Sequence, residues 1–160
     1  MDEKGVTICA GELKKKVRSV EINVSEDLPV VFTDPGAVEQ VMINLLINAI
    51  QAMDKGDSWI KVRAMLDPST TDYVQIEVSD NGCGMDKNTV DRIFEPFFTT
   101  KSPGTGTGLG LYVSQNLIDE LGGEILVESQ PGVGSTFSIR LPIEKNREGT
   151  PVDSTSQILS

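Results

Sequence analysis

Four carboxamide side chains recur at helical spacing within one apolar segment, "VEQVMINLLINAIQAM" (residues 38–53). Gln40, Asn44, Asn48 and Gln51 are spaced four, four and three residues apart, which places them in one stripe along a helix. The other faces of this helix are apolar nearly all the way round, so we expect it to be buried. A buried amide without a hydrogen-bond partner costs about 1–3 kcal/mol. We therefore expect this stripe to have something to bind.

The stripe has two interpretations. In the first, the helix belongs to an ordinary core and its amides pair with neighbouring backbone. In the second, Asn48, with Asn44 one turn away, offers neutral oxygen ligands to a hard cation. Mg²⁺ is usually held by few protein oxygens plus substrate phosphates, so an amide that faces a nucleotide-bound Mg²⁺ fits this pattern.

A second polar segment, "SDNGCGM" (79–85), directly follows a predicted strand. Asn-Gly is the strongest short signal for a hairpin turn, which is one interpretation. The next residues, "DKNTVDRIF", indicate a helix rather than a returning strand, and this disfavours the hairpin. Gly82 and Gly84 let the backbone approach a flat ligand closely. Asp80, at the strand end, would then accept a hydrogen bond from an exocyclic amino group such as adenine N6.

A third segment, "TTKSPGTGTGLGLY" (99–112), has glycines at alternate positions from 104 to 110 and leads into a predicted helix. Two common phosphate motifs do not fit, because there is no G-x-x-x-x-G-K-[ST] and the glycines follow a loop rather than a strand. Free N–H groups at a helix N-terminus nevertheless bind anions, and Lys101 adds a positive charge. We therefore expect a nucleotide lid here, with a flexible linker as the alternative.

The remaining segments predict the elements that position these residues. Asp34 followed by Pro35 is a suitable N-cap and first-turn pair for the long helix, which should close around residues 54–56. "PGVGSTF" (131–137) predicts a turn that places Thr136 on a strand, and taken alone this segment favours a plain hairpin. Helices and strands mix without regular βαβ alternation, which predicts an α+β fold, a two-layer α/β sandwich with three helices over one mixed sheet. The expected elements are a weak helix over 5–18, strands over 17–24, 59–66, 73–80, 124–129 and 135–141, and helices over 34–56, 86–94 and 109–121.

The composition excludes several classes of function. A net charge of −10 and a pI near 4.4 argue against nucleic acid as a partner, because phosphate binding needs a basic face. The absence of histidine removes histidine triads, histidine metal ligands and any imidazole general base.

Cys9 and Cys83 are far apart, so we expect neither a disulfide nor a zinc framework, and a reducing cytoplasm is the expected location. The longest apolar run has about ten residues, well short of the roughly 20 that cross a bilayer, and the N-terminus lacks the apolar core of a signal peptide, so we expect no membrane contact by this domain.

In their order and spacing, these segments resemble the ATP-binding catalytic domain of sensor histidine kinases, in the superfamily shared with gyrase, heat-shock chaperones and mismatch-repair ATPases. The matching motifs are "NLLINAIQA" for the N box, "DNGCGM" for the G1 box, "IFEPFFTTK" for the F box, "GTGLGL" for the G2 box and "GSTF" for the last glycine box. Nitrogen-regulation-type kinases look most similar. The implied fold is the Bergerat ATP-binding fold, with a mainly antiparallel sheet. The implied organisation is a connector over 1–17, the catalytic domain over 18–143 and a disordered tail over 144–160.

The resemblance also implies a role for each matching residue. Asn48 would coordinate Mg²⁺ and Asn44 would support the phosphate side. Asp80 would bond adenine N6, Thr136 would help to close the base pocket, and Lys101 would reach toward the terminal phosphates. The implied catalytic residues are therefore Asn44, Asn48 and Lys101. The full implied ATP-binding set is Asn44, Asn48, Gln51, Ala52, Asp80, Gly82, Gly84, Met85, Phe94, Lys101, Gly104, Gly106, Thr107, Gly108, Leu109, Gly110, Leu111 and Thr136. Three phenylalanines would anchor the lid, with ordinary core packing as the alternative: Phe94, Phe97 and Phe98.

One position distinguishes classes within this superfamily. The ATP-hydrolysing members and the serine-directed kinases carry a glutamate where this chain has Asn44, and an amide cannot accept a proton. Glu39 is a poor substitute, because five residues along a helix place it about 140° from the Asn44–Asn48 face. A histidine target brings its own base, so the resemblance implies transfer of the γ-phosphoryl group of ATP to a histidine. Since this chain has no histidine, the acceptor would lie on a separate dimerisation domain of a parent kinase, membrane-anchored or not, with a response regulator as indirect partner. The alternatives are a serine-directed kinase or anti-sigma factor of the same fold, and a degenerate nucleotide-binding module.

Overall fold

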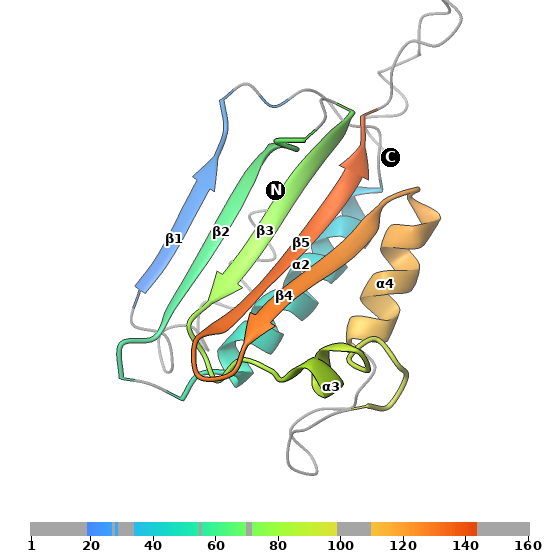
Figure 1. Cartoon of the computed structure of the whole chain (residues 1–160). Coiled ribbons are helices and arrows are strands. Elements are labelled where there is room, and N and C mark those ends of the chain that lie inside the picture. The colour runs from blue at the N-terminus through green and yellow to red at the C-terminus, as the bar shows by residue number, and fades with distance from the viewer. Residues whose placement is uncertain are drawn as a thin grey trace, which may run out of the picture.

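Figure 1 shows the computed structural model, which describes residues 19–26, 28, 34–54, 56–69, 72–98 and 110–143. The described strands form one five-stranded sheet in the order β1-β2-β3-β5-β4, in which β1 is parallel to β2 and the other neighbours are antiparallel. In this view α2 lies behind the sheet, α4 lies beside it, and α3 lies at one end. The predicted α+β two-layer sandwich is confirmed. The strands are β1 (Ser19–Val24), β2 (Trp59–Leu66), β3 (Tyr73–Asp80), β4 (Glu124–Gln130) and β5 (Gly134–Pro142), and the helices are α2 (Pro35–Gln51), α3 (Lys87–Val90) and α4 (Gly110–Glu120).

The hydrophobic core lies between the sheet and the helices. Along β3, buried residues alternate with half-buried ones, so Val74, Ile76 and Val78 face the helices. β2 and β3 have the bounds that the sequence predicts. Leu45 of α2 and Phe137 of β5 are among the largest side chains that the core removes from water. Burying side chains of this size contributes about 1.5–3 kcal/mol each, which fixes the face that each strand turns toward α2 and α4.

The long helix α2 begins as predicted and ends early. The Asp34 carboxylate caps its N-terminus by accepting hydrogen bonds from two backbone N–H groups of the first turn, at 3.0 and 3.3 Å. The helix ends at Gln51, with Ala52 as its C-cap. The predicted closure around residues 54–56 is therefore wrong. The Ala52 carbonyl accepts a hydrogen bond from the Cys83 N–H at 2.9 Å, so a loop distant in sequence takes over where the helix would have continued.

The two shorter helices also differ in length from their predictions. α3 has four residues and is capped by Asp86, whose carboxylate accepts from the Thr89 N–H at 2.8 Å. This hydrogen bond lowers the pKa of Asp86. The predicted helix over 86–94 is thus too long, because after α3 the backbone continues in three-residue turns toward Pro96. α4 ends at Glu120, one residue short of the predicted end at 121, and Gly122, with a φ of 79°, suits the helix C-terminus as expected.

Several predicted segments lie outside the described residues. They are the weak helix over 5–18 together with the connector over 1–17, the glycine-rich loop from residue 99 to 109, and the tail over 144–160. Among the helices of the described part of the chain, none combines the length and the apolarity needed to cross a bilayer.

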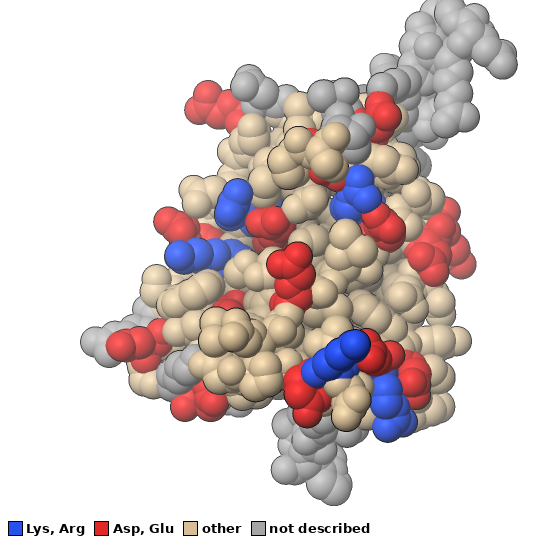
Figure 2. Space-filling model, viewed as in Figure 1, with Lys and Arg blue, Asp and Glu red and all other residues tan. Residues whose placement is uncertain are grey.

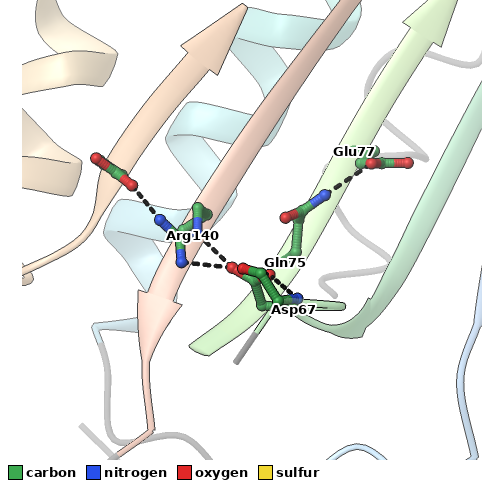
Figure 3. A network of polar contacts seen from close by, with 6 residues as sticks. Asp67, Gln75, Glu77 and Arg140 are labelled. Atoms are coloured by element: carbon green, nitrogen blue, oxygen red, sulfur yellow. Dashed lines mark hydrogen bonds and ion pairs between the residues drawn. The ribbon is translucent and has the colours of Figure 1, made fainter. Parts of the chain in front are cut away.

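The face of the sheet away from the helices is polar. Figure 2 shows that its basic side chains are scattered and that acidic side chains lie beside them. Figure 3 shows one network on this face, centred on Arg140 of β5. The guanidinium donates to Asp67 at 2.5 Å and to Glu124 of β4, and it stacks over the Tyr73 ring at 4.5 Å. Because Asp67 directly follows β2, the network joins β2, β3, β5 and β4 at the end of the sheet where β3 begins.

Candidate functional site

Asp80 is the last residue of β3, and its side chain lies on the face of the sheet that packs against the helices. Only 4% of its surface is exposed, and its carboxylate accepts a hydrogen bond from the Gly82 N–H at 2.8 Å. The neighbouring Asn81 fixes the loop to the start of β2, since its side chain accepts from the Trp59 N–H and donates to the Asp57 carbonyl, both at 2.8 Å. The Asp80 carboxylate is therefore held by the backbone of the loop that follows β3, and Asn81 fixes that loop to the start of β2.

The glycines after Asp80 are required by the packing of the protein itself. A β-carbon on Gly82 would collide with the carbonyl oxygen of Ala52, at the end of α2. Gly84 has a φ of 68°, and a β-carbon there would collide with the carbonyl oxygen of Gln130. The loop between them donates from the Cys83 N–H to Ala52 and accepts at the Cys83 carbonyl from the turn between β4 and β5, at 2.7 Å. The loop over 81–85 is thus clamped between α2 and the β4–β5 hairpin.

The amide stripe of α2 finds its partners at the start of α4. The Gln40 side-chain amide donates to the Asn44 carbonyl oxygen at 3.0 Å. Asn44 in turn donates to the Gly110 carbonyl at 3.2 Å and to the Ser114 hydroxyl at 3.0 Å. Ser114 is fully buried and donates to the same Gly110 carbonyl at 2.7 Å. For this half of the stripe, the interpretation as amides paired with neighbouring groups is correct, and those groups belong to α4.

The other half of the stripe leads to the loop over 81–85. Asn48 and Gln51 are half-buried and continue the stripe toward the C-terminal end of α2, where Ala52 contacts Gly82. One helix therefore connects the first turn of α4 with the carboxylate-bearing loop. The distance along α2 from Asn44 to Ala52 is about 12 Å, from eight residues at a rise of 1.5 Å.

Strand register places Ser135, and not Thr136, beside Asp80. Asp80 of β3 pairs directly with Ser135 of β5, and Ser135 pairs directly with Ser129 of β4. The three side chains form a row on the helix-facing side of the sheet, and Ser135 is only 6% exposed. Thr136 points to the opposite face, where its hydroxyl contacts that of Ser79 at 2.9 Å. The position that the resemblance implies for Thr136 in the base pocket is therefore not the one observed.

The sequence did contain a signal for this assignment. Phe137 is an apolar residue near the start of a predicted strand, and it belongs to the core. Strand side chains alternate, so an inward Phe137 requires an inward Ser135 and an outward Thr136. Ser129 lies outside all of the motifs, and only the register of β4 against β5 brings it into the row.

Several other predicted residues pack against the core. Met85, Phe94 and Leu111 are half-buried and contact it. Phe98 does so as well, whereas Phe97 is 72% exposed and has a φ of 66°, which is uncommon for a residue with a β-carbon. Phe97 is thus not packed in the way that its grouping with the other two phenylalanines implies. The remaining predicted site residues lie outside the described part of the chain: Lys101, Gly104, Gly106, Thr107, Gly108 and Leu109.

Comparison with known proteins identifies the family. Residues 33–145 match the family described as "Histidine kinase-, DNA gyrase B-, and HSP90-like ATPase". The chain belongs to this ATPase family. Sporulation kinase E of Bacillus subtilis (strain 168) is 41% identical over 130 residues, which are 81% of this chain and 17% of that protein. The signal transduction histidine-protein kinase AtoS of Escherichia coli (strain K12) is 41% identical over 120 residues, 75% of this chain and 19% of that protein.

Solved structures show the same fold. The catalytic domain of histidine kinase ThkA superposes with a TM-score of 0.73 at 32% identity, covering 88% of each chain. Full-length ShkA in complex with AMPPNP gives a TM-score of 0.76 at 26% identity, covering 89% of this chain and 29% of that one. This chain therefore has about the size of the ThkA catalytic domain, and it spans less than a fifth of sporulation kinase E and of AtoS.

Within this ATPase family the chain resembles the sensor histidine kinases in particular. AtoS and ThkA are named as histidine kinases, and the α+β sandwich of ThkA and ShkA is the fold described here. The similarity to the nitrogen-regulation-type kinases stays a prediction.

Proposed function

We propose that this chain is the catalytic domain of a sensor histidine kinase, which binds ATP with Mg²⁺ and transfers the γ-phosphoryl group to a histidine on a separate dimerisation domain. The observation that carries the proposal is the buried Asp80 carboxylate, fixed by the Gly82 N–H, at one end of a helix whose amide stripe meets α4 at the other. A carboxylate accepts hydrogen bonds and does not donate them, so it suits an exocyclic amino group such as adenine N6.

The proposal gives each end of the nucleotide a place along α2. The base would lie against the loop over 81–85, with Asp80 and Ser135 beside it and Met85 packed below. The phosphates would extend along α2 toward the first turn of α4. Along this path, Asn48 would hold Mg²⁺ together with phosphate oxygens, and the ion would neutralise charge on the phosphates. From the resemblance, Lys101 and the backbone of the glycine-rich segment would add positive charge on the same side. Catalysis of this kind depends mainly on positioning and charge neutralisation.

The hydrogen bonds of Asn44 support a histidine target rather than water or serine. Its amide nitrogen donates to two oxygen acceptors, Gly110 and Ser114, so the side chain is committed as a donor at this point. It does not provide a general base for activating water or a hydroxyl group. An imidazole nucleophile with a base in its own domain does not need one here. Because the chain contains no histidine, the acceptor must be supplied by another domain.

The wider setting follows from the same proposal. The parent would be a two-component sensor kinase, and the phosphoryl group would pass from its histidine to a response regulator. This domain would work in the cytoplasm, on nucleotide and on protein partners rather than on nucleic acid or membrane. The connector over 1–17 would join it to the dimerisation domain.

A transfer assay tests the proposal. The 160-residue chain is mixed with labelled ATP, Mg²⁺ and the dimerisation domain of its parent kinase, with an acceptor His→Gln variant as the control. We expect acid-labile, base-stable label on the dimerisation domain and none on the variant. Label on a serine of the partner would instead support a serine-directed kinase. Nucleotide binding without transfer would support a degenerate binding module and contradict the proposed activity.

A further inference from the structure

Ser129 of β4 makes three hydrogen-bond contacts with its hydroxyl group. It accepts from the Met85 N–H at 2.8 Å, contacts the Gly134 carbonyl at 3.1 Å and contacts the Ser135 hydroxyl at 2.8 Å. A hydroxyl group has one proton to donate and two lone pairs that accept. These three contacts therefore use the full capacity of the Ser129 hydroxyl.

The identity of each partner fixes the direction of each bond. The Met85 N–H can only donate, so it takes one lone pair of Ser129. The Gly134 carbonyl can only accept, so it receives the one proton of Ser129. When all three contacts form together, the remaining contact, with Ser135, uses the second lone pair of Ser129. Ser135 is consequently the donor in that bond, and its own proton points away from Asp80.

This arrangement leaves two acceptors side by side. Ser135 is the direct cross-strand neighbour of Asp80, and directly opposed residues on adjacent strands have β-carbons about 4.5–5.5 Å apart. With its proton committed to Ser129, the Ser135 hydroxyl presents only lone pairs beside a carboxylate that also presents only lone pairs.

We infer that Ser129 acts as a positioning residue for base selection: it orients the Ser135 hydroxyl as an acceptor, so that the site favours a purine with an amino group at position 6 over one with a keto group. This rests on the proposed function, because it assumes that the base lies against Asp80. An amino group offers two protons to the two acceptors. A 6-keto group would place a third acceptor against them and would supply no proton from position 6.

Comparing ATP with ITP in the 160-residue chain tests the inference, because inosine carries a keto group where adenine carries the amino group. Affinities for the two nucleotides with Mg²⁺ are measured by calorimetry. In Ser129→Ala the Ser135 hydroxyl is free to turn and donate to a keto oxygen. We expect the ratio of ATP affinity to ITP affinity to fall by about 3- to 10-fold, the size of one neutral hydrogen bond. Ser129→Thr keeps the hydroxyl and should restore the ratio.

The chain provides a matched control in Ser79. Its hydroxyl forms the same kind of contact, with Thr136, at the same end of the sheet but on the outer face. Ser79→Ala should leave the nucleotide ratio unchanged. If Ser129→Ala does not fold, Ser135→Ala serves instead, because it leaves the bonds from Ser129 to Met85 and Gly134 in place. It should lower the same ratio.

A double variant separates positioning from structural support. Since Ser129 is inferred to act through Ser135, adding Ser129→Ala to Ser135→Ala should not lower the ratio further. A ratio that stays at the wild-type value in both single variants would overturn the inference and leave the proposed function standing. So would additive losses in the double variant. Failure of the wild-type chain to bind either nucleotide would overturn the proposed function and the inference together.

Discussion

Asn44 illustrates how neighbours decide the role of a single side chain. Its amide oxygen accepts from Gln40, and its amide nitrogen donates to Gly110 and Ser114, so both ends are used inside the protein. The sequence predicts the stripe correctly and leaves two interpretations open. Only the position of α4, which starts 66 residues after Asn44, shows which groups the amide meets.

Replacing Asn44 should therefore lower stability. In Asn44→Ala the bonds to Gly110 and Ser114 are lost, and we expect the free energy of unfolding to fall by about 1–2 kcal/mol in urea titrations. Asn44→Asp should be at least as costly, because a carboxylate cannot donate to those two oxygens. Asn116→Ala, an exposed change on α4, is the control and should stay within about 0.5 kcal/mol of wild type. An Asn44→Asp variant with the same free energy of unfolding as wild type would show that these hydrogen bonds do not contribute to stability.

The same scale shows where the sequence was insufficient. Whether Ser135 or Thr136 faces Asp80 depends on one residue of register in β5. The motif "GSTF" was matched to the family by residue type alone. Which of its side chains points inward is set by Phe137, which lies in the core. Ser129 could not be found from any motif, because its relevance comes from pairing with Ser135. Residue types were predictable from the sequence, the direction of Ser135 follows from the inward Phe137, and the relevance of Ser129 needed the register of β4 against β5.

At the scale of elements, the strands were easier to predict than the helix ends. β2 and β3 carry clear alternation between apolar and polar residues, and their bounds agree with the prediction. The C-terminus of α2 differs from its prediction, because Cys83 and Gly82, from a different part of the chain, contact Ala52 where the helix ends. α3 was overextended for a related reason, since helical periodicity continues past Val90 while the backbone changes to three-residue turns. Tertiary contacts that end an element leave no local signal.

The clamp on the loop over 81–85 gives a prediction at this scale. Gly84 and Gly132 both have positive φ angles, 68° and 77°, but they differ in their surroundings. A β-carbon at Gly84 would collide with the Gln130 carbonyl, whereas at Gly132 it would meet nothing within 4 Å. Gly132→Ala should therefore cost only the backbone strain, about 1 kcal/mol of unfolding free energy.

Gly84→Ala should cost more than that, by at least about 1 kcal/mol, because the loop must move away from β4 in addition. It should also lower ATP affinity, since the loop carries the Asp80 partner Gly82. Urea titrations and calorimetry on the two variants measure both effects. Equal stability losses at the two glycines would contradict the clamp.

At the scale of the whole molecule, the polar network of Figure 3 holds the end of the sheet farthest from Asp80. Two hydrogen bonds from Ser69, from its backbone N–H and its hydroxyl, lower the pKa of Asp67, and the Arg140 guanidinium lowers it further. The same contacts with Glu124 and Asp67 raise the pKa of Arg140. A carboxyl group whose pKa is depressed by folding stabilises the folded state above its ordinary value of 3.8, and this contribution is lost as the pH falls through the lower, folded-state value.

The contribution of the ionised Asp67 carboxylate to stability should appear in the pH dependence of the melting temperature of an Asp67→Asn variant. We expect the variant to melt at a lower temperature than wild type at pH 7, because an amide cannot replace the charge facing Arg140. Below pH 4 the difference should shrink, because the unfolded chain, in which Asp67 has its ordinary pKa, takes up a proton before the folded protein does. Ser138→Ala, an uncharged outer-face change on β5, should follow the wild-type curve. A difference that stays constant from pH 7 to pH 3 would contradict the role given to Asp67.

The most direct test of the whole account is calorimetric binding of ATP and Mg²⁺ to the 160-residue chain and to its Asp80→Ala variant, with circular dichroism to verify the fold and Asp119→Ala as an exposed control. We predict that the wild-type chain binds ATP and that Asp80→Ala binds it about 10- to 100-fold more weakly, the value of a hydrogen bond to a charged acceptor. Asp119→Ala should bind like wild type. Equal ATP affinity in a folded Asp80→Ala variant would contradict the account.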